Sequence, residues 1–390
     1  MRSGARNKEK RKICFISFWP VYYIYSKLFN TLGEAHPELQ LSTLFSEDYK
    51  GVDAGARFFQ PLYLRTTYPL KGTPFQSYLG AKTLNFSYFL GLESFIKENS
   101  PDVIISILYY SLVSAQAYRS ASRKNADFIL MPEEKGPPSF PPARLITGAF
   151  DSIFGEKMLS RCKRVLPWTV EAVDYFSQKL YLHDESLKEK VRLFPAGIDL
   201  NQFYPLPRRK FRISGKLKIL VVANFWPFKD HATLVEAVRI LKSRNYPCEV
   251  SLLGSGPLKE IVFSKIKDFG LENYFRDLGR VPYSRMRDLY IEHDLLILPS
   301  KKEPIGMCVP EAMACGTPVI TSTAVTRTYI KEGENALVFR TQDPQDLAEK
   351  IMLMDDNRMI ENFGEKGAEH IRLNFDLKKL AEEFYNCLIN

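Results

Sequence analysis

Residues 299–320 read PSKKEPIGMCVPEAMACGTPVI; they follow a short apolar run at 294–298 and end inside another at 318–321. Each run has the length of a buried strand, and the residues between them predict a loop that carries Glu303 and then a short helix. Pro310 suits the first position of that helix, and Gly316 suits its left-handed end. This strand–helix–strand order is the repeating unit of parallel α/β sheets.

The same alternation of short apolar strands and amphipathic helices extends over the whole chain. Prolines and charges at 204–210 interrupt it, so we expect a domain boundary near residues 200–212. The sequence therefore predicts two doubly wound domains, 1–200 and 201–374, and a terminal helix at 375–390 that packs back toward the first domain. The expected strands are 12–17, 103–108, 128–131, 218–222, 249–253, 294–298 and 318–321, and the clearest expected helices are 232–243 and the one that Thr169 caps, which runs to about 182.

Composition and charge narrow the class of protein. The six cysteines are scattered without a CxxC pair, which is typical of a reduced, intracellular protein with neither disulfides nor a zinc site. The first residues are basic and lead into a short strand, so we expect no signal peptide and a cytoplasmic protein. The stretch 103–118 is shorter than the roughly 20 apolar residues of a membrane span. The net charge of +9 fits anionic lipid, a phosphorylated substrate or a solvated surface, and no nucleic-acid motif accompanies it.

Two glutamates flank the start of the predicted short helix. Glu303 lies on the loop and Glu311 in the first turn, and the backbone N–H groups of residues 306–309 are expected to be free between them. A diphosphate on those amides would have a carboxylate on either side to accept hydrogen bonds from sugar hydroxyls. A solvated loop charge and a helix-dipole partner explain the glutamate pair alone equally well.

The full run resembles the retaining glycosyltransferases of family 4, whose GT-B fold has two Rossmann-like domains facing a central cleft. The most specific part of the likeness is a pair of glutamates separated by seven residues, the second of which begins the run EAMACGTPVI. The likeness is strong over about residues 190–345 and thin before them. Four further segments match in the expected order: FPAGID at 194–199, VVAN at 221–224 with KDH at 229–231, LGSGP at 253–257 and LGRVP at 278–282.

This resemblance implies roles for individual residues. Glu303 would hold hydroxyls of the donor sugar, and Lys229 would neutralise charge on the leaving diphosphate; these are the expected catalytic residues. Glu311 would hold the ribose hydroxyls. The other implied donor contacts are Asn224, Gly254 (close backbone approach), Val281 (the base, through backbone groups) and the amides of Gly306, Met307 and Cys308.

One departure from the family lies in the donor half. The family usually has an arginine five residues before its lysine, and here that position is Asn224, which brings no charge. The candidates for the missing cation are Lys301, Lys302 and Arg280.

A second departure lies in the first domain. SFWP at 17–20 stands where a glycine-rich turn is usual, and MPEE at 131–134 stands where a histidine is usual. We expect Phe18 and Trp19 to present aromatic faces to a sugar acceptor, or else to fill the core beneath the following helix. Glu133 is an acceptor-site candidate or a solvated charge. No catalytic histidine is predicted, and His231 is expected to cap a helix or to be solvated.

The expected function follows from these observations. No Asp-x-Asp triplet occurs, so neither a metal nor a resident cofactor is expected. The predicted enzyme moves a sugar from a UDP- or GDP-sugar to a hydroxyl of a glycan, glycolipid or lipid-linked acceptor. Basic and aromatic residues at 51–97 suggest peripheral association with an anionic membrane, with an aromatic core and basic rim as the alternative. The alternative functions are a sugar-nucleotide epimerase or hydrolase, and a non-catalytic partner subunit.

Overall fold

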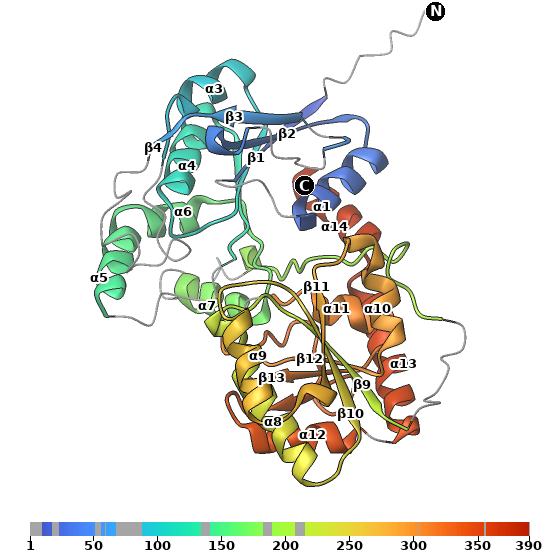
Figure 1. Ribbon diagram of the computed structural model, residues 1–390. Helices are drawn as coiled ribbons and strands as arrows, with labels where there is room; N and C mark the ends of the chain where they lie inside the picture. Colours follow the sequence, from blue (N-terminus) through green and yellow to red (C-terminus); the bar gives the residue numbers. More distant parts are fainter. Residues whose placement is uncertain are drawn as a thin grey trace, which may run out of the picture. The chain divides into compact units, whose positions relative to one another are not determined.

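The computed structural model describes residues 10–17, 23–50, 56–58, 60–67, 88–133, 141–181, 189–206, 215–303, 305–354 and 356–389. The chain divides into two compact units (Figure 1). The first comprises residues up to Gly197 together with Leu377–Asn390, and the second comprises Ile198–Asp376.

The first unit contains a parallel six-stranded sheet of order β3-β2-β1-β6-β7-β8. The chain steps outward from β1 to β3 and then returns to the other side of β1 at β6. The carboxyl ends of β1 and β6 therefore meet at the topological switch point, where ligands of such sheets bind. The strands are β1 Arg11–Ile16, β2 Leu39–Ser46, β3 Gln60–Leu64, β6 Val103–Ser106, β7 Asp127–Leu130 and β8 Arg164–Val165, with β4 Thr66–Thr67 and β5 Tyr88–Phe89 as a separate antiparallel pair.

The helices of the first unit include the end of the chain. The last helix, α14 (Leu377–Ile389), packs on α1 (Tyr23–Ala35), and the ring of Phe384 lies 5.0 Å from that of Phe194. No helix among the described residues has the length and apolar character that a membrane span requires. The other helices are α3 Leu92–Asn99, α4 Leu112–Lys124, α5 Pro141–Phe150, α6 Glu156–Arg161 and α7 Val170–Tyr181; a π-helical turn, Asp151–Gly155, joins α5 to α6.

The second unit repeats the design with a parallel sheet of order β11-β10-β9-β12-β13-β14. Figure 1 shows α8 and α9 on one side of this sheet and α10, α11 and α13 on the other. Helices on both faces explain why β12 is buried along its whole length. The strands are β9 Leu217–Val222, β10 Cys248–Leu253, β11 Phe275–Gly279, β12 Leu295–Leu298, β13 Val319–Ser322 and β14 Leu337–Phe339; the helices are α8 His231–Ser243, α9 Lys259–Asp268, α10 Met286–Glu292, α11 Cys308–Ala314, α12 Pro344–Leu353 and α13 Asn357–Asn374.

The expected fold class, two doubly wound α/β domains, is confirmed. The predicted strands occur within one or two residues of their expected bounds. Thr169 caps α7 as predicted, since its hydroxyl accepts a hydrogen bond from the Ala172 amide at 3.2 Å. In the second sheet the switch point lies between β9 and β12, so the residues that follow these two strands come together.

Candidate functional site

Glu303 and Lys229 meet at the switch point of the second sheet. Lys229 ends a 3₁₀ turn, Pro227–Lys229, after β9, and Glu303 lies in the loop after β12. The Lys229 ammonium donates to Oε2 of Glu303, and the Ser300 hydroxyl donates to the same oxygen at 3.2 Å. Only 9% of the Glu303 side chain and 17% of the Lys229 side chain are exposed. The two expected catalytic residues therefore form a largely desolvated ion pair, whose charges depend on each other for compensation.

Gly306 allows the backbone to turn close beside this pair. Its φ is +63°, in the left-handed region that favours glycine. A Cβ at this position would lie 2.9 Å from Cδ2 of Leu298 and 3.1 Å from Cγ of Glu303. A side chain here would therefore press on both the strand end and the carboxylate.

The helix that follows starts earlier than its sequence suggests. It begins at Cys308, so Pro310 occupies its third position and not the first. Proline is tolerated there because N–H groups of the first turn have no acceptor within the helix. The Val309 amide, expected to be free, donates to the Gly306 carbonyl at 2.8 Å, because the chain already turns before the helix. Gly316 has φ +73°, as its predicted left-handed position requires. The remaining candidate amides are those of Gly306, Met307 and Cys308.

Glu311 is buried and is not a solvated partner of the helix dipole. Its Oε2 accepts from the Tyr290 hydroxyl at 2.8 Å, and its Oε1 accepts from the Tyr283 hydroxyl at 2.5 Å. Sequence reasoning missed both tyrosines. The available signal was the position of Tyr283, two residues after Val281 in the turn that the resemblance assigns to the base.

The glycine turn after β10 presses against the end of β9. Gly254 has φ +152°, and a Cβ there would lie 2.3 Å from the carbonyl oxygen of Ala223. The side-chain oxygen of Asn224 accepts from the Ser255 amide at 3.3 Å, and Nε of Arg280 donates to the Ser255 hydroxyl at 2.8 Å. Asn224 and Arg280 thus contact the same turn, Asn224 through the Ser255 amide and Arg280 through the Ser255 hydroxyl.

The three candidate cations differ in their surroundings. Lys301 forms an ion pair with Asp230 at 3.5 Å, and Lys302 is exposed on the same loop. Arg280 reaches the glycine turn through the neutral hydroxyl of Ser255. Of the three, Arg280 is the one that the structure joins to the turn beside Asn224.

His231 is neither solvated nor a capping side chain. It is the first residue of α8, 4% exposed, and its ring stacks on Phe225 with centroids 4.3 Å apart. Burial lowers the pKa of His231 to about 4, so the ring is neutral at pH 7. The expectation failed because the ring packs inward beneath the end of β9.

The acceptor candidates lie in the first unit. Phe18 and Trp19 fall outside the described residues. Glu133 follows β7 and is half-buried, and its Oε1 accepts from the Tyr25 hydroxyl at 3.2 Å. Glu133 is therefore tied to α1, and its acceptor role stays a prediction.

A polar cluster that sequence reasoning missed lies at the carboxyl end of β6. Asp151 accepts from the Tyr109 hydroxyl at 2.6 Å and from Nζ of Lys179 at 2.5 Å. The same ammonium lies 5.5 Å from the ring centres of Tyr109 and Tyr175. These residues are far apart in sequence, and the π-helical turn brings Asp151 to them. The cluster joins the end of β6 to α7 near the switch point of the first sheet.

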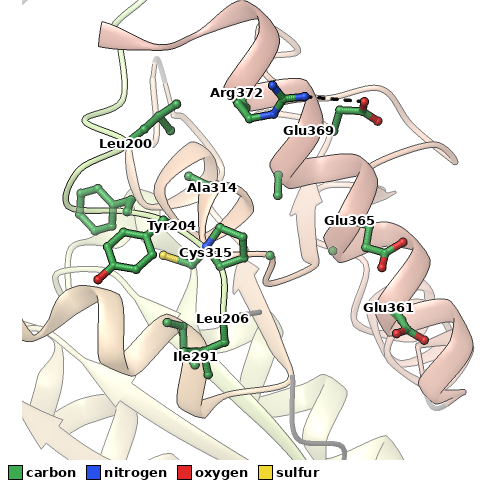
Figure 2. Close-up of a pocket in the computed structure, with 15 residues that line it drawn as sticks. Leu200, Tyr204, Leu206, Ile291, Ala314, Cys315, Glu361, Glu365, Glu369 and Arg372 are labelled. Carbon is green, nitrogen blue, oxygen red and sulfur yellow. Dashed lines mark ion pairs between the residues drawn. The ribbon is translucent and has the colours of Figure 1, made fainter. Parts of the chain in front are cut away.

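A cavity of about 1070 Å³ lies elsewhere on the second unit, between residues 200–206 and α13 (Figure 2). Its floor is the carboxyl end of α11, from Ala314 to Gly316, and Glu361 and Glu365 line the α13 side. None of the expected donor-site residues is among the described residues that line it. The cavity is thus separate from the Glu303–Lys229 pair, which lies beyond the opposite end of α11.

Metal ligands were also sought among the described residues. They contain no group of three or more His, Cys, Asp or Glu side chains placed to hold a metal ion. Metal independence stays a prediction.

Comparison with known proteins finds a family model that matches most of the second unit. Residues 206–370 match the model of the glycosyl transferases group 1. These residues make up most of the second unit, which is therefore similar to this glycosyltransferase family. The D-inositol 3-phosphate glycosyltransferase of Paenarthrobacter aurescens is 28% identical over 212 residues, which are 50% of this chain and 50% of that protein. The chain spans about half the length of the curated relatives it matches.

Solved glycosyltransferase structures match over both units. Sucrose-phosphate synthase from Thermosynechococcus elongatus superposes with a TM-score of 0.69 at 18% identity, covering 96% of this chain and 98% of that one. Anabaena HepE, solved in complex with UDP and glucose, gives 0.69 at 15% identity, covering 97% and 99%. At these identities the likeness shows the fold, and the fold is the GT-B type that the sequence predicted.

Proposed function

We propose that this protein is a glycosyltransferase that moves a sugar from a nucleotide-diphosphate donor, held by the second unit, to an acceptor hydroxyl. The observation that carries the proposal is the desolvated Glu303–Lys229 pair beside the glycine-shaped start of α11. The bond that breaks joins a sugar to a diphosphate. A carboxylate suits the hydroxyls of the sugar, an ammonium suits the diphosphate, and here both lie at one switch point. Glu303 accepts hydrogen bonds from hydroxyls of the donor sugar, and Lys229 faces the diphosphate.

The reaction that we propose retains the configuration of the sugar. The bond from the anomeric carbon to the diphosphate oxygen breaks, and a bond from that carbon to the acceptor oxygen forms on the same face. The acceptor oxygen attacks the anomeric carbon directly, so no enzyme nucleophile is needed. The acceptor proton passes to the leaving phosphate. Lys229 stabilises the negative charge that develops on the diphosphate, a contribution that grows in a site from which water is excluded.

We also propose that the enzyme needs no metal. The amides of Gly306, Met307 and Cys308 and the ammonium of Lys229 supply the positive potential that the diphosphate requires. Burial raises the pKa of the Cys308 thiol to about 12, so the thiol stays neutral beside the phosphate. Arg280 is the candidate for the charge that Asn224 lacks. Gly254 and Val281 complete the donor site, with Val281 meeting the base through its backbone.

The donor is proposed to be a UDP- or GDP-sugar, and the structure of Anabaena HepE with UDP and glucose supports the first of these. The acceptor is proposed to be a glycan, a glycolipid or a lipid-linked sugar that packs on Trp19, with Phe18 and Glu133 beside it. The reaction would take place in the cytoplasm, at the inner face of an anionic membrane.

Two measurements test this proposal. In the first, UDP, GDP, ADP and their common sugars are screened for a rise in melting temperature, since a ligand at 100 times its Kd stabilises by about 2.7 kcal/mol. In the second, release of free nucleotide from the best donor is followed with and without acceptor extract. Release that requires the acceptor supports a transferase. Equal release without acceptor indicates a hydrolase, and binding without turnover indicates a non-catalytic subunit.

A further inference from the structure

Two tyrosines that differ in burial donate hydrogen bonds to Glu311. Tyr290 is completely buried on α10, whereas Tyr283 is half-buried in a 3₁₀ turn, Tyr283–Arg285, that contains no buried residue. Each donates to a different oxygen of the carboxylate. A carboxylate that loses water on burial must be compensated by hydrogen bonds, from the protein or from a ligand. Tyr283 and Tyr290 provide hydrogen bonds of this kind from the protein itself.

Ring packing and a backbone hydrogen bond fix the position of Tyr290. Its ring centre lies 6.0 Å from that of Phe203, and its carbonyl accepts from the Thr317 hydroxyl at 2.5 Å. Burial, with the negative charge of Glu311 as the next cause, raises the pKa of Tyr290 well above its ordinary value. Its hydroxyl consequently stays protonated and donates to Oε2 at every working pH.

Tyr283 occupies a position that a nucleoside would need. It follows Val281 and Pro282 in the turn that is proposed to meet the base. Its hydroxyl donates a hydrogen bond to Oε1 of Glu311, the residue proposed to hold the ribose. One edge of its ring touches Phe203, with centres 5.7 Å apart. Rotation of this single half-buried side chain would remove its hydrogen bond from Oε1 without moving a strand or helix.

We propose that Tyr283 is a specificity-determining residue of the donor site, whose hydroxyl occupies the place of a ribose hydroxyl on Glu311 until nucleotide binds. The inference rests on the proposed function, because it takes Glu311 as the ribose ligand. When a nucleoside diphosphate enters, Tyr283 leaves Oε1 and a ribose hydroxyl donates in its place. Tyr290 keeps Oε2 fixed throughout. The protein therefore binds a ribonucleotide more tightly than its dideoxy counterpart only by the difference in free energy between two similar hydrogen bonds.

Removal of the Tyr283 hydroxyl should make that preference larger. In wild type, a dideoxynucleotide binds while Tyr283 stays on Glu311, and a ribonucleotide binds by displacing it. In Tyr283→Phe, the ribonucleotide supplies a hydrogen bond to Oε1 without displacing the hydroxyl of residue 283. The ratio of the Kd for the dideoxynucleotide to the Kd for the ribonucleotide should therefore rise about tenfold, equivalent to about 1.4 kcal/mol. A purely structural role for Tyr283 would change both constants alike.

The test is calorimetric titration of UDP and 2′,3′-dideoxy-UDP, and of GDP and 2′,3′-dideoxy-GDP, into wild type and four variants. Tyr283→Phe should show the tenfold higher ratio. Tyr290→Phe should show a lower ratio, because Glu311 is no longer held in place. Tyr274→Phe, a partly buried tyrosine outside the site, is the matched control and should leave the ratio unchanged.

The inference is overturned if Tyr283→Phe binds a ribonucleotide and its dideoxy form with the wild-type ratio or a smaller one. The proposed function fails separately, and this inference with it, if wild type binds neither UDP nor GDP, or if Glu311→Ala binds them as wild type does. Titration of Glu311→Ala in the same series distinguishes these outcomes.

Discussion

The ammonium group of Lys229 donates a hydrogen bond to Oε2 of Glu303, although 74 residues separate the two in sequence. The contact exists because β9 and β12 are neighbours at the centre of the second sheet. Both side chains are nearly out of water, so each charge is compensated mainly by the other and by nearby polar groups. The pair therefore affects both stability and the proposed chemistry.

A double-mutant cycle measures the stability effect. Lys229→Met should lower the free energy of unfolding by about 3 kcal/mol, because it removes the cation that pairs with the buried Glu303 carboxylate. Lys229→Met with Glu303→Gln should cost clearly less than the sum of the single changes. The exposed pair Arg123–Glu93 is the control and should couple by less than about 1 kcal/mol. Additive effects at 229 and 303 in urea unfolding would rule out an energetically important pair.

Gly254 offers a test of the close contact at the glycine turn. Gly254→Ala should lower stability or abolish nucleotide binding, because its Cβ would lie 2.3 Å from a backbone oxygen that cannot move away cheaply. Gly333→Ala is the matched control, since Gly333 has φ +77° with no atom within 4 Å of its Cβ position and should cost only about 1–2 kcal/mol. Thermal unfolding of both variants gives the comparison. Equal losses would mean that the contact at Ala223 is unimportant.

His231 predicts a pH dependence of stability. Its folded pKa of about 4 lies below the unfolded value near 6.5, so between these values the unfolded chain binds more protons. Its contribution is therefore complete above pH 6.5 and is lost as the pH falls toward 4, amounting to about 3–4 kcal/mol. Urea unfolding at pH 4.5 and pH 7 should show a smaller difference for His231→Gln than for wild type. If the free energy of unfolding falls equally in both proteins between pH 7 and pH 4.5, another group is responsible for the loss of stability in acid.

The acceptor prediction concerns Trp19, which lies outside the described residues. If an acceptor sugar packs on its indole, Trp19→Ala should raise the acceptor KM and leave nucleotide affinity and the melting temperature unchanged. Loss of folding, or no kinetic change, would instead favour the alternative in which this ring fills the core. Binding to anionic liposomes at low salt separately tests the membrane proposal.

The sequence predicted the parts of this protein that depend on periodicity and on one well-marked motif. The strand around 294–298 and the helix after Thr169 follow from local patterns, and Glu303, Gly306 and Glu311 belong to a single contiguous stretch. Parallel-sheet topology then brings Lys229 to Glu303, two residues to which the family resemblance gave separate roles.

Contacts between side chains of different helices and turns within one unit could not be predicted in this way. Tyr283 and Tyr290 reach Glu311 from a turn and from α10, and no spacing in the sequence links them to it. The inward packing of His231 depends on the ring of Phe225, which precedes it by six residues around a 3₁₀ turn. The cluster around Asp151 requires the extra residue of a π-helical turn, for which the sequence pattern carries no clear signal.

The central claim is tested most directly by the turnover of Glu303→Gln. With the donor identified by thermal shift, acceptor-dependent release of nucleotide is measured for wild type, Glu303→Gln and Glu260→Gln; Glu260 is an exposed glutamate on α9 and serves as the matched control. Loss of hydrogen bonds to a charged group costs roughly 1.5–3 kcal/mol, so kcat of Glu303→Gln should fall more than tenfold at saturating donor. Glu260→Gln should keep wild-type kcat. A Glu303→Gln protein that turns over at the wild-type rate would contradict the account.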